Sequence, residues 1–66
     1  MYRLEQDVFG RWIIVHPEHT NLAWSGSRWM PHYRGIGSAA QISNFTSREA
    51  ADEIAIAQIV RPIGSA

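Results

Sequence analysis

The segment from Trp24 to Trp29, which reads Trp-Ser-Gly-Ser-Arg-Trp, restricts the fold of this chain more than any other. Glycine at the first central position of a two-residue loop is typical of a type II′ turn, because that position requires a positive φ angle. A loop that begins at Gly26 places Trp24 opposite Trp29 in a non-hydrogen-bonded pair, where side chains approach most closely. The sequence therefore predicts a tight antiparallel hairpin with a cross-strand tryptophan pair.

The rest of the chain must supply a small core around this hairpin. A chain of 66 residues with no cysteine has room for one domain and no disulfide to support it. Apolar residues make up 45% and charged residues 18%, which is typical of globular proteins. Six arginines balance six acidic residues, so a strongly electrostatic partner is not implied. We expect one domain, 1–66, that is soluble, cytoplasmic and without a membrane-spanning segment.

Further strands are predicted before and after the hairpin. Tyr2 and Leu4 alternate with charged residues, as in a half-buried strand, and Asp7-Val8-Phe9-Gly10 has the composition of a type I turn. Residues 11–16 are β-branched and aromatic, which favours a central strand covered on both faces. The predicted strands are 2–6, 11–16, 22–25 and 28–33, and a further short strand at 41–45 is left open.

A helix is predicted over about 47–60. Thr46-Ser47-Arg48-Glu49 matches a capping box in which Thr46 is the N-cap, and Pro62 prevents much continuation. The predicted fold is therefore α+β: a three- or four-stranded antiparallel β-meander followed by one C-terminal helix packed on the sheet.

On a helical wheel, Ala50, Ile54 and Ala57 form the stripe expected to pack on the sheet, with Ala51 and Val60 at its margins. The opposite side carries Ile56 and Ile59 in its second half, and Ile63 follows just beyond the helix. Exposed apolar patches usually mark a partner surface. The alternatives are that the helix rotates or frays after Ala55, or that Ile63 folds back to cover the patch. The sequence thus favours a non-catalytic module for protein–protein interaction or homodimerisation, with partner-binding residues Ile56, Ile59 and Ile63.

Catalytic and metal chemistry find little support in the sequence. His16 and His19 lie in a turn that contains proline rather than one helical turn apart, and nothing brings His32 to them, so surface histidines are favoured over a metal site. The serines fit turn and cap positions. We expect no enzyme activity, no cofactor and no metal.

The alternative function is nucleic-acid binding through the hairpin region 24–34. Arginine contacts phosphates and stacks on bases, as aromatic rings also do. The competing interpretation is that the tryptophan pair forms core, and zero net charge weakens non-specific affinity for nucleic acid. The candidate residues for this surface are Trp24, Arg28, Trp29, His32, Tyr33 and Arg34.

Residues 11–57 are predicted to form three strands followed by one helix. The helix opens with Phe45-Thr46-Ser47-Arg48-Glu49-Ala50. This plan resembles that of the small DNA-binding modules of phage-type integrases and plant AP2 factors. The resemblance implies a sheet laid in the major groove. This chain departs from those families in having few basic residues on its strand faces.

Overall fold

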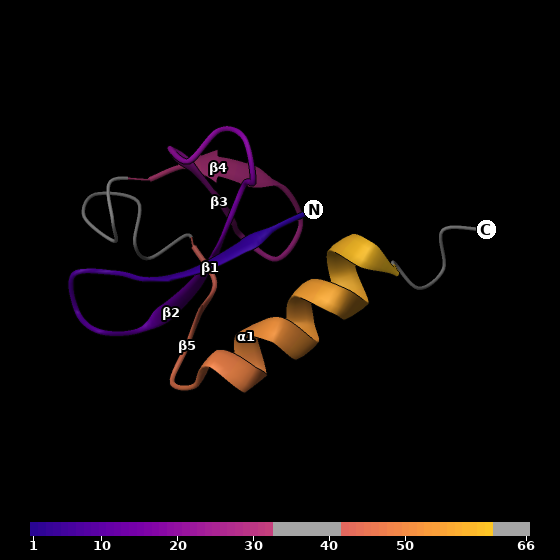
Figure 1. The fold of residues 1–66 in the computed structure, drawn as a ribbon. Coiled ribbons are helices and arrows are strands. Elements are labelled where there is room, and N and C mark those ends of the chain that lie inside the picture. The colour runs from indigo at the N-terminus through magenta and orange to yellow at the C-terminus, as the bar shows by residue number, and fades with distance from the viewer. Residues whose placement is uncertain (33–41, 62–66) are drawn as a thin grey trace.

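The computed structural model describes residues 1–32 and 42–61, and these form a small α+β domain with one helix beside a sheet (Figure 1). Four strands form an antiparallel sheet in the order β1-β2-β3-β4, and a fifth strand pairs with β2. The strands are β1 (Arg3–Gln6), β2 (Trp12–Val15), β3 (Leu22–Trp24), β4 (Trp29–Pro31) and β5 (Asn44–Phe45). The helix α1 (Arg48–Ala55) continues as a π-helical segment, η2 (Ile56–Val60). The predicted fold class is confirmed, and the strand left open at 41–45 exists as β5.

Strand β2 is central and covered on both faces, as its apolar run predicts. It pairs with β1 along its length, while β3 and β5 share its other edge. Ile14 packs on the helix side with two alanines of α1, whereas Ile13 and Val15 join Ala23 and Ile42 in a second cluster. Because side chains alternate along a strand, one short segment supplies both parts of the core.

The β3–β4 hairpin has the predicted register. Trp24 pairs with Trp29, their ring centroids lie 5.1 Å apart at 68°, and Gly26 has a φ of +105°. Edge-to-face contact of this kind is a favoured geometry for aromatic pairs. The glycine therefore allows a loop that brings the two indoles together.

The β1–β2 hairpin turns through the predicted Asp7–Gly10 segment. The Gly10 amide donates to the Asp7 carbonyl at 3.1 Å, and Gly10 has a φ of +81°. The Asp7 amide donates to the Arg11 carbonyl at 2.8 Å, and the Asp7 carboxylate accepts from the Phe9 and Arg11 amides. This is a type I turn followed by a glycine bulge, and the aspartate side chain holds it in shape.

The helix begins one residue later than the capping box predicts. Ser47 is the N-cap, and its hydroxyl accepts from the Ala50 amide at 3.1 Å. The prediction that Thr46 is the N-cap is therefore wrong. With Ser47 as the N-cap, the third helical position is Ala50 instead of Glu49, so the capping box does not form. Both hydroxyls have the right chemistry, and pairing of Phe45 with Trp12 positions the chain so that Ser47 adopts the extended cap conformation.

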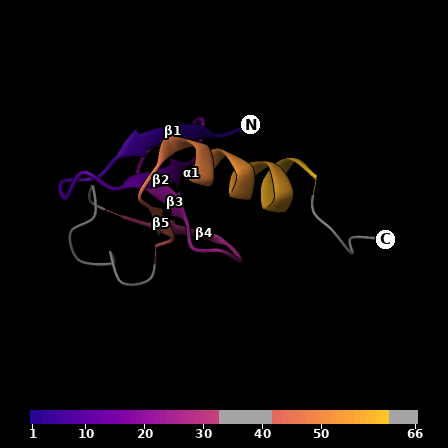
Figure 2. The same ribbon diagram turned by 90° about the horizontal axis from the view of Figure 1, so that it is seen from below.

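The face of α1 on the sheet is also turned relative to the predicted stripe, of which Ile54 alone packs on the helix-side cluster. Ala51 and Ala55 are fully buried against Ile14, whereas Ala50 and Ala57 are only half-buried. The helix is therefore rotated by about one residue, roughly 100°, from the predicted stripe. Alanines on the buried line let the helix approach the sheet closely, and Figure 2 shows α1 lying along one side of the strands. Within the described residues, no helix is long and apolar enough to cross a membrane.

Candidate protein-binding surface

The two isoleucines of η2 have different environments. Ile59 is half-buried and packs on the cluster of Ile14, Ala51 and Ala55, whereas Ile56 is 38% exposed. The prediction that both share one exposed side is wrong. Ile59 follows Ala51 and Ala55 at spacings of four residues, which places it on the helix face that packs on the sheet, whereas Ile56 lies one residue further round the helix from Ala55. Ile63 lies outside the described residues.

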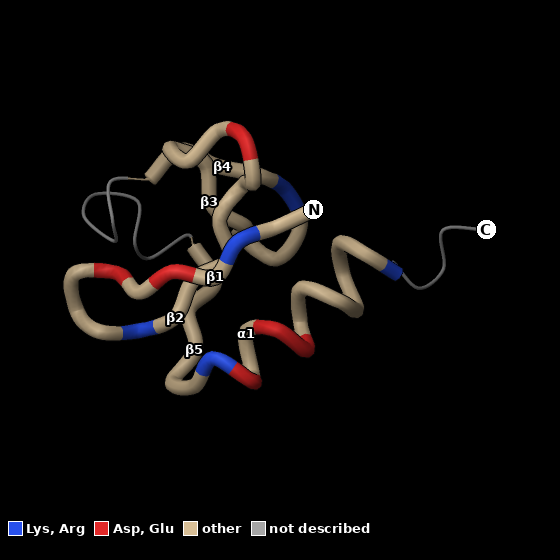
Figure 3. Tube along the Cα trace, viewed as in Figure 1, with Lys and Arg blue, Asp and Glu red and all other residues tan. Residues whose placement is uncertain are grey.

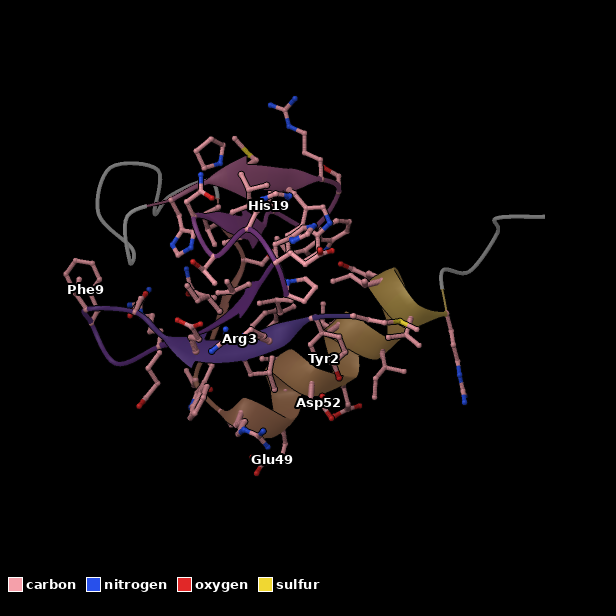
Figure 4. All side chains as sticks on the ribbon, turned by 45° about the horizontal axis from the view of Figure 1, so that its top comes forward. Tyr2, Arg3, Phe9, His19, Glu49 and Asp52 are labelled. Atoms are coloured by element: carbon pink, nitrogen blue, oxygen red, sulfur yellow. The ribbon has the colours of Figure 1, made fainter. Side chains whose placement is uncertain are left out.

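Ile56 lies on the side of the helix that faces β1. Its amide donates to the Asp52 carbonyl, so its side chain follows that of Asp52 one turn along. The Tyr2 hydroxyl at the start of β1 donates to the Asp52 carboxylate, and Figure 4 shows these two side chains meeting between strand and helix. Ile56 therefore continues a stripe that borders the beginning of β1.

A second exposed apolar side chain lies at the same end of the molecule. Met1 is 77% exposed, and the amino terminus lies alongside the later turns of the helix in Figures 1 and 2. Residues 56–60 carry no charge, and the next charged residue is Arg61, as Figure 3 shows. We call Met1 and Ile56 the apolar corner.

The contact between Tyr2 and Asp52 changes the acidity of the tyrosine. The hydrogen bond to Asp52 raises the pKa of Tyr2 above its ordinary value of 10.0, and desolvation and the negative charge of Asp52 raise it further. The charge of Arg48 acts in the opposite direction. Tyr2 is therefore neutral throughout the physiological range and acts as a hydrogen-bond donor that joins β1 to α1.

Strand β1 forms one edge of the sheet. Tyr2 and Leu4 pack on the helix-side cluster, as their alternation predicts. On the other face, Arg3 and Glu5 form an ion pair with 3.7 Å between Nε and Oε2, and their side chains are 57% and 30% exposed. Within residues 1–32 and 42–61, β1 pairs only with β2, so no described strand occupies its outer edge.

The tip of the β1–β2 hairpin presents two further apolar side chains. Val8 is 52% exposed and Phe9 is 69% exposed, and Figure 4 shows Phe9 at the end of the molecule opposite the later helix turns. We call these two residues the apolar tip. Sequence reasoning did not assign them a role, although the central positions of a type I turn point side chains into solvent.

The tryptophans of the alternative nucleic-acid surface pack inward. Trp24 and Trp29 both lie against the helix-side cluster, and the Trp24 indole Nε1 donates to the Gln58 side chain at 2.8 Å. His32 is buried, with 5% of its surface exposed. Arg28 is exposed at the hairpin loop, and Tyr33 and Arg34 lie outside the described residues. Among the described residues of the hairpin, the aromatic rings therefore pack on the core rather than form an exposed surface on which bases could stack.

The histidines take local hydrogen-bonding positions. Nδ1 of His16 accepts from the Glu18 and His19 amides, so this ring holds the turn between β2 and β3. Nε2 of His32 lies 3.0 Å from the Thr20 carbonyl. His32 is therefore a buried residue, and the expectation that it lies on the surface is wrong. Among the described residues, no group of three metal-ligating side chains is placed to hold a metal ion.

Comparisons with protein-family models, with curated proteins and with solved structures find no match for this chain. The described surface features of the chain are therefore the basis for its proposed function.

Proposed function

We propose that this protein is a non-catalytic binding module that associates with protein, including a second copy of itself, through the apolar corner. The observation that carries the proposal is Ile56, which is 38% exposed on an uncharged helix end while the neighbouring Ile59 is half-buried against the helix-side cluster. The helix thus packs one isoleucine on the core and leaves the other partly exposed, near the end of the molecule where the amino terminus lies.

The size of the domain supports the same conclusion. A chain of 66 residues buries a smaller fraction of its surface than a larger domain does, and a partner can cover what the fold leaves exposed. Burying Ile56 and Met1 would release ordered water and contribute roughly 25 cal/mol for each Å² of apolar surface covered.

Sedimentation velocity of the full chain over a wide range of concentration tests this proposal. We expect the wild-type protein to form a dimer at high concentration and the Ile56→Glu variant to remain monomeric, because a charge would be buried without a partner. The fold should survive, since Ile56 is not among the fully buried residues. Circular dichroism of the variant checks this point.

Arg28→Glu is the matched control, because it adds negative charge at an exposed position in the β3–β4 loop, far along the sheet from β1. This variant should dimerise as the wild type does. A dimer that survives the Ile56→Glu substitution unchanged would overturn the role of the corner in self-association.

A further inference from the structure

We infer that the second copy binds by antiparallel pairing of β1 with β1, centred on Leu4, so that the two sheets become one. This inference rests on the proposed function, because it names the partner and the geometry by which the apolar corner is covered. Three independent features of β1 support it: the direction of its backbone groups, its charge pattern and the position of the apolar residues at its two ends.

The backbone of β1 offers the correct hydrogen-bonding groups. The Asp7 amide points toward β2, since it donates to the Arg11 carbonyl. Backbone groups alternate in direction along a strand, so those of Arg3 and Glu5 also face β2. The amide and carbonyl groups of Leu4 therefore point outward, together with those of the residues two before and two after it. Two such edges centred on Leu4 can exchange hydrogen bonds, with Leu4 opposite Leu4.

The charges on β1 favour this register. When Leu4 faces Leu4 of the second copy, Arg3 faces Glu5 of the second copy and the reverse pair is formed as well. These are non-hydrogen-bonded positions, where opposite Cα atoms are about 4.5 Å apart. An edge with charges of one sign would repel its copy, whereas the Arg-Leu-Glu order attracts it.

The same register gathers the exposed apolar residues. The apolar corner lies at the start of β1 and the apolar tip follows its end. Antiparallel pairing centred on Leu4 brings Met1 level with Asp7 of the second copy, one residue before Val8. The four large apolar residues that are exposed in the described part of the chain would thus meet in two equivalent groups. These residues are Met1, Val8, Phe9 and Ile56.

The opposite edge of the sheet is less suited to pairing. Strand β4 is three residues long and ends in Pro31, which has no amide to donate. The β1 edge contains no proline and has alternating side chains on both faces.

Charge reversal tests the register. Arg3→Glu makes the edge acidic and Glu5→Arg makes it basic, so each single variant replaces attraction by repulsion across the two-fold axis. We expect the dimer dissociation constant to rise about tenfold or more in each single variant. The double variant, Arg3→Glu with Glu5→Arg, restores the complementary order and should dimerise like the wild type.

Mixing the two single variants is the sharper test. The acidic and basic edges complement each other in the same register, so an equimolar mixture should form a heterodimer when neither variant alone forms a dimer. Hydrogen exchange gives a readout without mutation. The outward Leu4 and Gln6 amides should become protected as the wild-type concentration rises, whereas the Glu5 amide, already directed at β2, should change little.

The outcomes separate the two proposals. One outcome is that Ile56→Glu abolishes the dimer, whereas charge reversal does not weaken it and the Leu4 and Gln6 amides gain no protection. The β1 register would then be wrong, while the role of the apolar corner in association would be supported. If the wild-type protein remains monomeric at every concentration, self-association and the edge register both fail. Loss in the single variants with recovery in the double variant and in the mixture supports the register.

Discussion

Single polar side chains hold the elements of this domain together at specific points. Tyr2 joins β1 to α1 through Asp52, Trp24 joins β3 to η2 through Gln58, and the Asp7 carboxylate holds the first hairpin. Each contact links a residue of the sheet to a partner that the local sequence does not identify, apart from the turn aspartate. At the residue scale, long-range hydrogen bonds therefore join the helix to the strands at two points.

The raised pKa of Tyr2 predicts a change of stability at alkaline pH. The unfolded chain lacks the Asp52 contact, so Tyr2 ionises there near 10.0, below its pKa in the folded protein. The stabilisation is therefore fully present below about pH 10 and is lost as pH rises through the folded pKa. Urea unfolding from pH 7 to 12 should show a constant difference between wild type and Tyr2→Phe that shrinks above pH 10. A difference that stays constant to pH 12 would contradict this account.

At the scale of elements, the helix shows how small residues set an interface. Ala51 and Ala55 allow α1 to approach Ile14 closely, and Ile59, four residues after Ala55, packs on the same cluster. A helical wheel cannot distinguish the face of Ala51 and Ala55 from the stripe of Ala50 and Ala57, because both carry alanines and so have similar hydrophobicity. The packing partner on β2 decides between them.

Lengthening an alanine on each of the two faces tests the orientation of the helix. Ala51→Leu should destabilise the domain by about 1–3 kcal/mol, because the extra atoms have no space next to Ile14. Ala50→Leu, on the half-buried side, should change stability by only about 0.5 kcal/mol. Thermal unfolding measures both, with about 4–8 °C expected for each kcal/mol. Equal losses, or a larger loss at Ala50, would mean that the helix packs through the other stripe.

At the scale of the whole molecule, the large apolar residues that are exposed in the described part of the chain lie near the two ends of one edge strand. The proposed covering of these residues by a second copy would link folding to association, because the β1 edge exists only in the folded chain. The sheet would then extend across two protomers, and the charged pairs would fix the register.

Thermal stability should therefore depend on protein concentration. We expect the melting temperature of the wild-type chain to rise between micromolar and millimolar concentration, because dimerisation draws the equilibrium toward folded protein. The Arg3→Glu variant should melt at nearly the same temperature throughout this range. Calorimetry at several concentrations measures both, and a wild-type melting temperature that does not change with concentration would contradict the proposed dimer.

The sequence by itself determined the elements that depend on neighbouring residues. The Gly26 loop placed Trp24 opposite Trp29, and Asp7 with Gly10 predicted the first turn, because turn geometry follows from the φ angles and hydrogen bonds of a few consecutive residues. The helix range and the central position of β2 also followed from local patterns.

The tertiary structure alone decided which of two equivalent local choices was used. Pairing of β5 with β2 selected Ser47 over Thr46 as the cap, and packing against Ile14 selected Ala51 and Ala55 over the predicted stripe. The candidate surface differs from the predicted one for the same reason, because Ile59 packs on the helix-side cluster whereas Ile56 is 38% exposed. These choices depend on contacts between residues far apart in the chain. Such contacts do not change the hydrophobic pattern of either contacting segment, so they cannot be recognised from that pattern.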